Sequence, residues 1–313
     1  MIKYKILDHQ IVELDTGFIK EGIAACYLIQ SGEEYALIET GIRSTVADIS
    51  TLLSQFKISN KQLKYIIPTH VHLDHAGGVG LLMQQYPGAK LIVHPYGAAH
   101  MEDPAKLQAG AIAVYGEEAF HKTYGDLIPV DADRIITADD LFELKLGDRL
   151  FTFYDTPGHA RHHFCIHDSL SNGIFTGDTF GLAYPELSFD GKPFIFPTTT
   201  PVQFNPQDMK DSIRRLMGLN PDRLFLTHYG EIKASTYLMD EMNAQIDDFV
   251  NLTIEHKDSP NLVSDLSQAL QEYLINRKTK QGMSLESSFV KKIIKADSQL
   301  NAQGLAVWLQ KQL

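Results

Sequence analysis

Three histidines and one aspartate lie within six positions of one another: His70, His72, Asp74 and His75. Because side chains two residues apart point to the same side of an extended backbone, we expect His70 and His72 to face one way. Asp74 and His75 would enter the first turn of a helix and point elsewhere. Imidazole nitrogens and carboxylate oxygens are ligands that zinc takes in proteins. One loop can therefore offer two pairs of ligands to two neighbouring metal ions.

The sequence on either side of this loop predicts the elements that hold it. Residues 64–67, which are apolar after Lys64, end at Pro68, and this is typical of a short buried strand. Apolar residues at positions 79, 81, 82, 83 and 86 follow with the spacing of a helix. The glycines at 77 and 78 let the backbone turn tightly between the two elements. We therefore expect the four candidate ligands on a strand-to-helix loop.

A zinc ion takes about four ligands, so this loop cannot complete a metal site alone. Three further candidates follow predicted strands and stand next to glycine, proline or a strand end: His159, Asp178 and His228. Loops carried by a rigid sheet are where binding sites are usually built. We expect these three side chains to complete the site.

The order His-x-His-x-Asp-His, followed by His, Asp and His after later strands, resembles the metallo-β-lactamase superfamily of binuclear metal hydrolases. The resemblance covers residues from about 24 to 230 and implies an αββα sandwich. It also implies one ion bound by His70, His72 and His159, another bound by Asp74, His75 and His228, and Asp178 as the bridge between them. Members with aspartate at the bridging position include glyoxalase II, lactonases and phosphodiesterases. The supporting Asp-Thr-Gly of the family appears here as Glu39-Thr40-Gly41.

Two divalent ions about 3.5–4 Å apart can lower the pKa of a shared water toward about 7, and the hydroxide is then the nucleophile. No activated serine or cysteine is needed. Asp74 is placed to hold the second ion and to take a proton from the water. Tyr229, next to His228, is a candidate donor to an oxyanion, and the alternative is that it packs. The ligand set favours zinc, with iron or manganese as alternatives.

These features predict a metal-dependent hydrolase of a small ester, thioester or lactone. Three other functions stay open: a phosphodiesterase, a one-iron dioxygenase of the persulfide type, and a non-enzymatic regulator that retains the metal site. The oxygenase would need only His70, His159 and Asp178, and the complete second set of ligands speaks against it.

Composition limits the partners of the chain. With 39 acidic and 28 basic residues among 313, the formal net charge is −11, which argues against a nucleic-acid or anionic-membrane surface. Both cysteines, Cys26 and Cys165, lie in apolar runs and are expected to be buried thiols in the cytoplasm. No signal peptide is recognisable, and no apolar run approaches the ~20 residues of a membrane span. A small-molecule substrate is therefore the expected partner.

Two domains are expected, a catalytic domain over residues 1–232 and a helical subdomain over residues 233–313. Three amphipathic helices are predicted in the second, where they pack over an edge of the site, form a homodimer contact, or serve packing alone. Residues 96–128 contain helix-like apolar runs between two strands, which predicts either a layer packed on the sheet or a substrate-facing lid. Residues 180–206 hold five prolines and are predicted to be a long loop.

Overall fold

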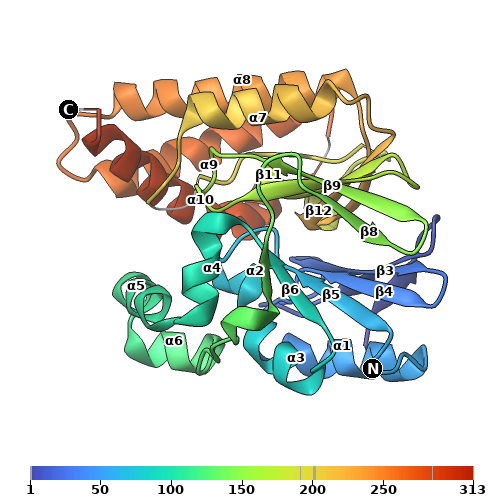
Figure 1. Ribbon diagram of the computed structural model, residues 1–313. Coiled ribbons are helices and arrows are strands. Elements are labelled where there is room, and N and C mark those ends of the chain that lie inside the picture. Colours follow the sequence, from blue (N-terminus) through green and yellow to red (C-terminus); the bar gives the residue numbers. More distant parts are fainter. Residues whose placement is uncertain (1, 191, 200–201, 284, 313) are drawn as a thin grey trace. The chain divides into compact units, whose positions relative to one another are not determined.

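Two β-sheets form the framework of the chain in a computed structural model, which describes residues 2–190, 192–199, 202–283 and 285–312 (Figure 1). The seven-stranded sheet has the order β1 (Tyr4–Ile6), β2 (Ile11–Asp15), β3 (Ala25–Ser31), β4 (Glu34–Ile38), β5 (Leu63–Ile67), β6 (Lys90–Val93) and β7 (Ile135–Thr137). The six-stranded sheet has the order β13 (Gly230–Lys233), β12 (Arg223–His228), β11 (Gly173–Leu182), β10 (Phe164–Asp168), β9 (Arg149–Asp155) and β8 (Glu143–Leu146).

The direction of the strands explains where the candidate ligands lie. Strands β1 to β4 pair antiparallel, and β4 to β7 pair parallel. Parallel neighbours need crossover connections, which helices α1 (Thr45–Gln55), α2 (Leu73–Ala76) and α3 (Val79–Gln85) supply. The carboxyl ends of β4 and β5 consequently meet at one edge, where the backbone N–H of Glu39 donates to the carbonyl of Ile67 at 3.0 Å. This edge carries Glu39 and the ligand loop that begins after Ile67.

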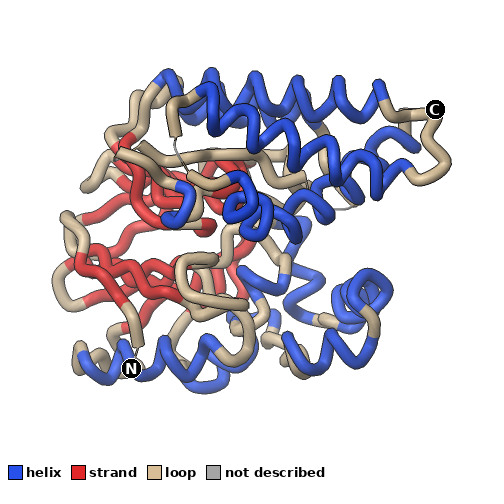
Figure 2. Tube along the Cα trace, turned by 180° about the vertical axis from the view of Figure 1, so that it is seen from behind, coloured by secondary structure: helices blue, strands red, loops and turns tan. Residues whose placement is uncertain are grey.

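Contacts along the chain define two compact units. The first comprises residues 1–155, 162–177 and 222–231, and the second comprises residues 156–161, 178–221 and 232–313. In the first unit, α1 and α3 pack on one face of the seven-stranded sheet through residues such as Ile49, Leu82 and Leu91. The strands form two layers (Figure 2). A second core contains buried side chains from strands of both layers, among them Tyr27, Phe153 and Phe175. The ligand loop is therefore mounted on a well-packed support.

Three helices occupy the interval between β6 and β7: α4 (Pro95–Glu102), α5 (Ala105–Tyr115) and α6 (Glu117–Thr123). The apolar runs predict α5 and α6, whereas α4 begins where a turn was expected. Phe120 and Tyr124 form a small cluster with Ile42 and with Leu73, which belongs to the ligand loop. The helices are thereby attached to that loop. That α4, α5 and α6 act as a lid over a substrate stays a prediction.

The second unit contains four long helices, α7 (Pro206–Met217), α8 (Thr236–Glu255), α9 (Leu262–Lys280) and α10 (Ser287–Gln310). The last three confirm the predicted C-terminal helices, with buried stripes such as Leu266, Leu270 and Leu274. The boundary at residue 233 stays a prediction. No helix in the described part of the chain is both long enough and apolar enough to cross a lipid bilayer.

The structure corrects the sequence reading at β11. We predicted a strand that ends before Asp178 and a loop from residue 180, but β11 continues to Leu182. Gly177 and Gly181, which seemed to end the strand, have φ values of 47° and 66° and occur within it. Because glycine adopts this conformation without a steric penalty, the strand continues through both positions. The loop begins later, and Leu182 still bridges to Phe196.

Candidate metal centre

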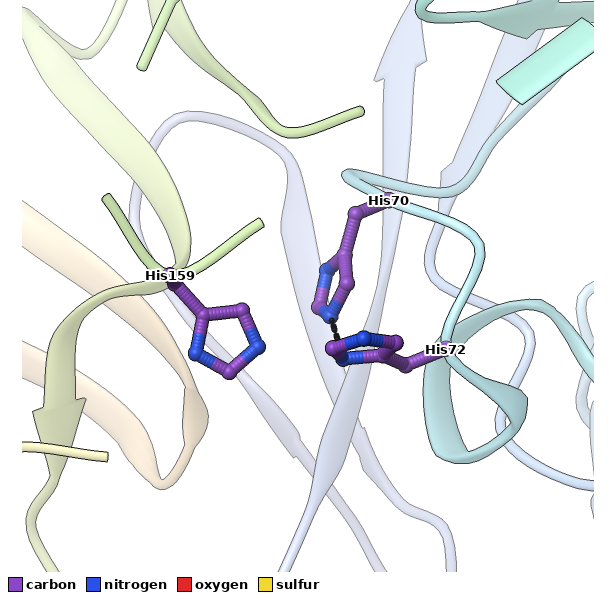
Figure 3. A group of neighbouring side chains, drawn as sticks. All are labelled: His70, His72 and His159. Atoms are coloured by element: carbon purple, nitrogen blue, oxygen red, sulfur yellow. Dashed lines mark hydrogen bonds between the residues drawn. The ribbon is translucent and has the colours of Figure 1, made fainter. Parts of the chain in front are cut away.

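The ligand loop presents its first two histidines to each other. His70 is buried, and His72 precedes the first residue of α2 in an extended conformation. The Nε2 atom of His70 lies 2.8 Å from Nδ1 of His72, and Figure 3 shows the two rings meeting at these atoms. This is the arrangement expected for side chains two apart on extended backbone.

Asp74, His75 and His228 form a second group, which lies wholly within the first unit. The Oδ2 atom of Asp74 is 3.7 Å from Nε2 of His75 and 3.4 Å from Nε2 of His228. Both histidines are buried, whereas Asp74 is half-buried. The loop after β5 and the end of β12 thus bring two imidazoles and one carboxylate together.

The Glu39 carboxylate lies beside His75 and accepts hydrogen bonds from its neighbours. Its Oε1 accepts from the hydroxyls of Thr69 at 2.6 Å and Thr227 at 2.9 Å, and lies 3.0 Å from Nδ1 of His75. Its Oε2 accepts from the backbone N–H of Thr69 at 3.1 Å. A buried carboxylate needs such donors, because burial without them would disfavour its charge. Glu39 therefore occupies the supporting position implied for the aspartate of Asp-Thr-Gly.

Two candidate ligands, His75 and His228, have hydrogen-bond partners at Nδ1 that determine the tautomer of the ring. Nδ1 of His75 lies by the Glu39 carboxylate, and Nδ1 of His228 lies 2.8 Å from the carbonyl of Ile23. These partners accept a hydrogen bond, so each neutral ring carries its proton on Nδ1 and presents a lone pair at Nε2. Metal-binding histidines are commonly oriented in this way. The donor set therefore fits a divalent metal ion.

Within the second unit, His159 and Asp178 lie close together, with their Nε2 and Oδ2 atoms 3.3 Å apart. The Nδ1 atom of His159 lies 3.4 Å from the carbonyl of Thr198. The loop that carries His159 is held by the start of α7, because the backbone N–H of Asn205 donates to the carbonyl of Gly158 at 2.8 Å. Both ligand-type side chains are buried.

All seven predicted ligands occur in groups that could hold a metal ion, with the potential ligand atoms of each group within 4.8 Å of one another. The groups are His70, His72 and His159 (Figure 3), His70, His75 and Asp178, and Asp74, His75 and His228. Joint binding of metal by these residues is a proposal developed below.

Three other side chains near the ligands have contacts of a different kind. Tyr229 packs on the core between the sheets, and burial, followed by the charges of Glu13 and Asp15, raises the pKa of its phenol. Its role as an oxyanion donor stays a prediction. Nδ1 of His162 lies 3.4 Å from the backbone N–H of Val71, and the His163 ring centroid is 4.9 Å from that of His70.

Apart from Glu39, the groups that orient the histidines were not identified from the sequence. Thr69 and Thr227 each precede a candidate ligand at the end of a strand, and both donate to Glu39. The repeated Thr-His pair was a signal that could have revealed them. The carbonyls of Ile23 and Thr198 left no such signal, because any residue supplies a carbonyl.

Comparison with known proteins agrees with this architecture. The profile of the metallo-β-lactamase superfamily matches residues 19–228. A metallo-β-lactamase fold-containing protein of Sulfurisphaera tokodaii is 32% identical over 223 residues, 70% of this chain and 77% of that protein. An acyl-coenzyme A thioesterase of Gallus gallus is 28% identical over 159 residues, 49% of this chain and 50% of that protein.

A solved structure of a metallo-β-lactamase family protein of Thermus thermophilus has a TM-score of 0.64 at 19% identity. The match covers 92% of this chain and 89% of the Thermus chain. This likeness and the family profile confirm the predicted αββα sandwich with C-terminal helices.

Proposed function

Because the chain belongs to the metallo-β-lactamase superfamily, we propose that it is a metal-dependent hydrolase of small esters, thioesters or lactones. The observation that carries the proposal is the set of three overlapping groups of ligand atoms. His70 and His75 each occur in two groups, and Asp178 occurs with both of them. This overlap supports two neighbouring ions with Asp178 between them.

The proposed centre uses histidine and carboxylate ligands throughout, which suits zinc and also iron or manganese. When bound, such ions supply an activated water and polarise the oxygen of the scissile carbonyl. The protein residues hold the ligands in place for this chemistry. Glu39 and the Ile23 carbonyl fix the rings of His75 and His228 with Nε2 free of a proton.

Asp74 differs from the other candidate ligands in its exposure, since its side chain is 25% exposed while His75 and His228 are buried. A carboxylate that reaches solvent can exchange protons during turnover. We assign to Asp74 both metal binding and acceptance of a proton from the attacking water, which is general base catalysis.

An ester-type substrate is supported by charge and by one relative. An acidic chain repels polyanions such as nucleic-acid backbones and gains little from counterion release. The Gallus gallus relative is named an acyl-coenzyme A thioesterase, and a thioesterase cleaves its substrate at a carbonyl. These two observations favour carbonyl substrates over phosphodiesters, and a small-molecule substrate over a macromolecule.

The test is a panel of p-nitrophenyl acyl esters, acyl thioesters, lactones and bis-p-nitrophenyl phosphate on one metal-loaded preparation. We expect the highest kcat/KM for a carbonyl substrate, loss of turnover on chelation, and recovery when metal is restored. A hundredfold preference for the phosphodiester, about 2.7 kcal/mol in transition-state stabilisation, would reject the ester proposal. Asp74→Asn is the matched variant, because it keeps the size of the side chain and removes the base.

A further inference from the structure

One buried side chain of the C-terminal helix α10 holds residues 197–199, the loop segment that lies beside Nδ1 of His159. Asn301 is 1% exposed, and its Oδ1 accepts from the backbone N–H of Thr199 at 2.6 Å. Its Nδ2 donates to the carbonyl of Pro197 at 3.0 Å. The Thr199 hydroxyl in turn donates to the backbone carbonyl of Asn301 at 3.0 Å. The Thr199 hydroxyl also lies 3.1 Å from Oδ1 of Asn301, so residues 197–199 are held to the helix by both the backbone and the side chain of Asn301.

The peptide group between Thr198 and Thr199 connects this anchor to His159. In a planar trans peptide the C=O and the following N–H point in opposite directions. When Asn301 holds the N–H of Thr199, the carbonyl of Thr198 must point away from α10. That carbonyl lies 3.4 Å from Nδ1 of His159. The amide of Asn301 thus sets the direction of the acceptor that His159 uses.

We infer that Asn301 is a positioning residue for His159, acting through the peptide group between residues 198 and 199. The inference rests on the proposed function, in which His159 binds a metal ion through Nε2. Hydrogen bonding at Nδ1 keeps the proton there and leaves the lone pair at Nε2, which faces Asp178 at 3.3 Å. Through this chain of contacts the C-terminal helices take part in metal binding rather than only in packing.

A second buried amide in the same unit provides the control. Gln245 of α8 is fully buried and donates from Nε2 to the carbonyl of Ile195 at 2.8 Å. The N–H that follows this carbonyl belongs to Phe196 and donates to the carbonyl of Leu182. Gln245 therefore anchors the same loop without setting the Thr198 carbonyl. Loss of either amide should lower the stability of the fold, but only loss of Asn301 should change the tautomer of His159.

The experiment compares Asn301→Leu with Gln245→Leu in the full chain. Metal affinities are measured by competition with a chromophoric chelator, and the His159 tautomer is read from ¹⁵N shifts of the metal-free protein. We expect Asn301→Leu to weaken one ion by about 10–100-fold, as loss of outer hydrogen bonds to metal-binding histidines does, and to reduce the Nδ1–H form of His159. Gln245→Leu should leave both readings unchanged. Asn301→Asp keeps an acceptor for the Thr199 N–H and should restore part of the affinity.

Two results separate this inference from the proposed function. If His159→Ala weakens metal binding while Asn301→Leu changes neither affinity nor tautomer, the positioning role is wrong and the ligand assignment stands. If His159→Ala leaves metal binding intact, the ligand assignment fails, and the tautomer reading alone decides whether Asn301 orients the ring. Should Asn301→Leu not fold, Asn301→Ala removes the same two amide contacts, to the Thr199 N–H and the Pro197 carbonyl, without adding bulk. An unchanged tautomer in that variant would also overturn the positioning role.

Discussion

The Nδ1 atom of His75 lies 3.0 Å from Oε1 of Glu39, and both side chains are buried. Glu39 directly follows β4, and His75 lies in α2, the first helix after β5. The two threonines that share the carboxylate are Thr69, two residues beyond β5, and Thr227, near the end of β12. One carboxylate therefore connects the ends of three strands to one candidate metal ligand. The position of His75 depends on this junction.

Replacement of Glu39 by glutamine should weaken metal binding by Asp74, His75 and His228. The amide keeps one acceptor oxygen, but its NH₂ group would face a donor on at least one side. We expect about a 10–100-fold loss of affinity for one ion, measured by chelator competition. Glu39→Asp retains the charge with a shorter side chain and should lose less. Equal affinities for Glu39→Gln and the wild type would contradict a supporting role.

Asp178 and His228 should differ in how many ions they affect. If Asp178 bridges, Asp178→Ala leaves two cations with less neutralisation between them, so both should bind more weakly. His228→Ala should release mainly the ion held with Asp74 and His75. Elemental analysis after gel filtration at several free-metal concentrations measures both occupancies. Loss of a single ion in both variants would count against the bridge.

Much of the candidate site could be predicted, because the residues that identify it form short patterns in the sequence. The spacing in His-x-His-x-Asp-His fixes which side chains share a loop, and Asp178 and His228 each follow a short apolar run. The supporting contacts depend on distant pairing. Glu39 meets His75 only because β4 and β5 are parallel neighbours, and Asn301 lies 102 residues from Thr199. Strands of three and four residues, such as β7 and β13, carry too few residues for a pattern.

Gly158 should be essential for the position of His159. Its φ of 131° is unfavourable for other residues, and a Cβ there would lie 2.3 Å from Cα of Met209 in α7. Because this neighbour is backbone, Gly158→Ala should shift the loop and weaken the ion that His159 binds. Gly282→Ala is the matched control, with a φ of 77° and no atom within 4 Å of the added Cβ.

We expect Gly282→Ala to lower stability by about 1–2 kcal/mol, the cost of a left-handed residue, and to retain full metal affinity. Calorimetry and chelator competition on the same preparations separate the two effects. Intact metal affinity in Gly158→Ala would show that the loop tolerates the added methyl group, against this prediction.

The free energy of unfolding should fall at alkaline pH because the buried phenol of Tyr27 keeps its proton in the folded protein. Its hydroxyl donates to the carbonyl of Leu226 at 2.5 Å, which connects β3 to β12. Burial, followed by the nearby charge of Glu13, raises the pKa of this phenol well above its ordinary value. The folded protein therefore keeps the proton, while the unfolded chain releases it above about pH 10. Stability conferred by the neutral phenol is complete below that pH and is lost as the pH rises, by about 1.4 kcal/mol per unit.

Tyr27→Phe removes both the hydrogen bond and the titration. We expect a loss of about 0.5–1.5 kcal/mol at pH 7.5 that shrinks above pH 10, because the variant lacks the alkaline penalty. Cys26, whose thiol pKa is also raised by burial, should begin a similar decline from about pH 8.5, and Cys26→Ala should remove that earlier part. Urea unfolding at intervals from pH 7.5 to 11 measures both slopes. A constant difference between Tyr27→Phe and the wild type across this range would mean that Tyr27 does not keep its proton on folding.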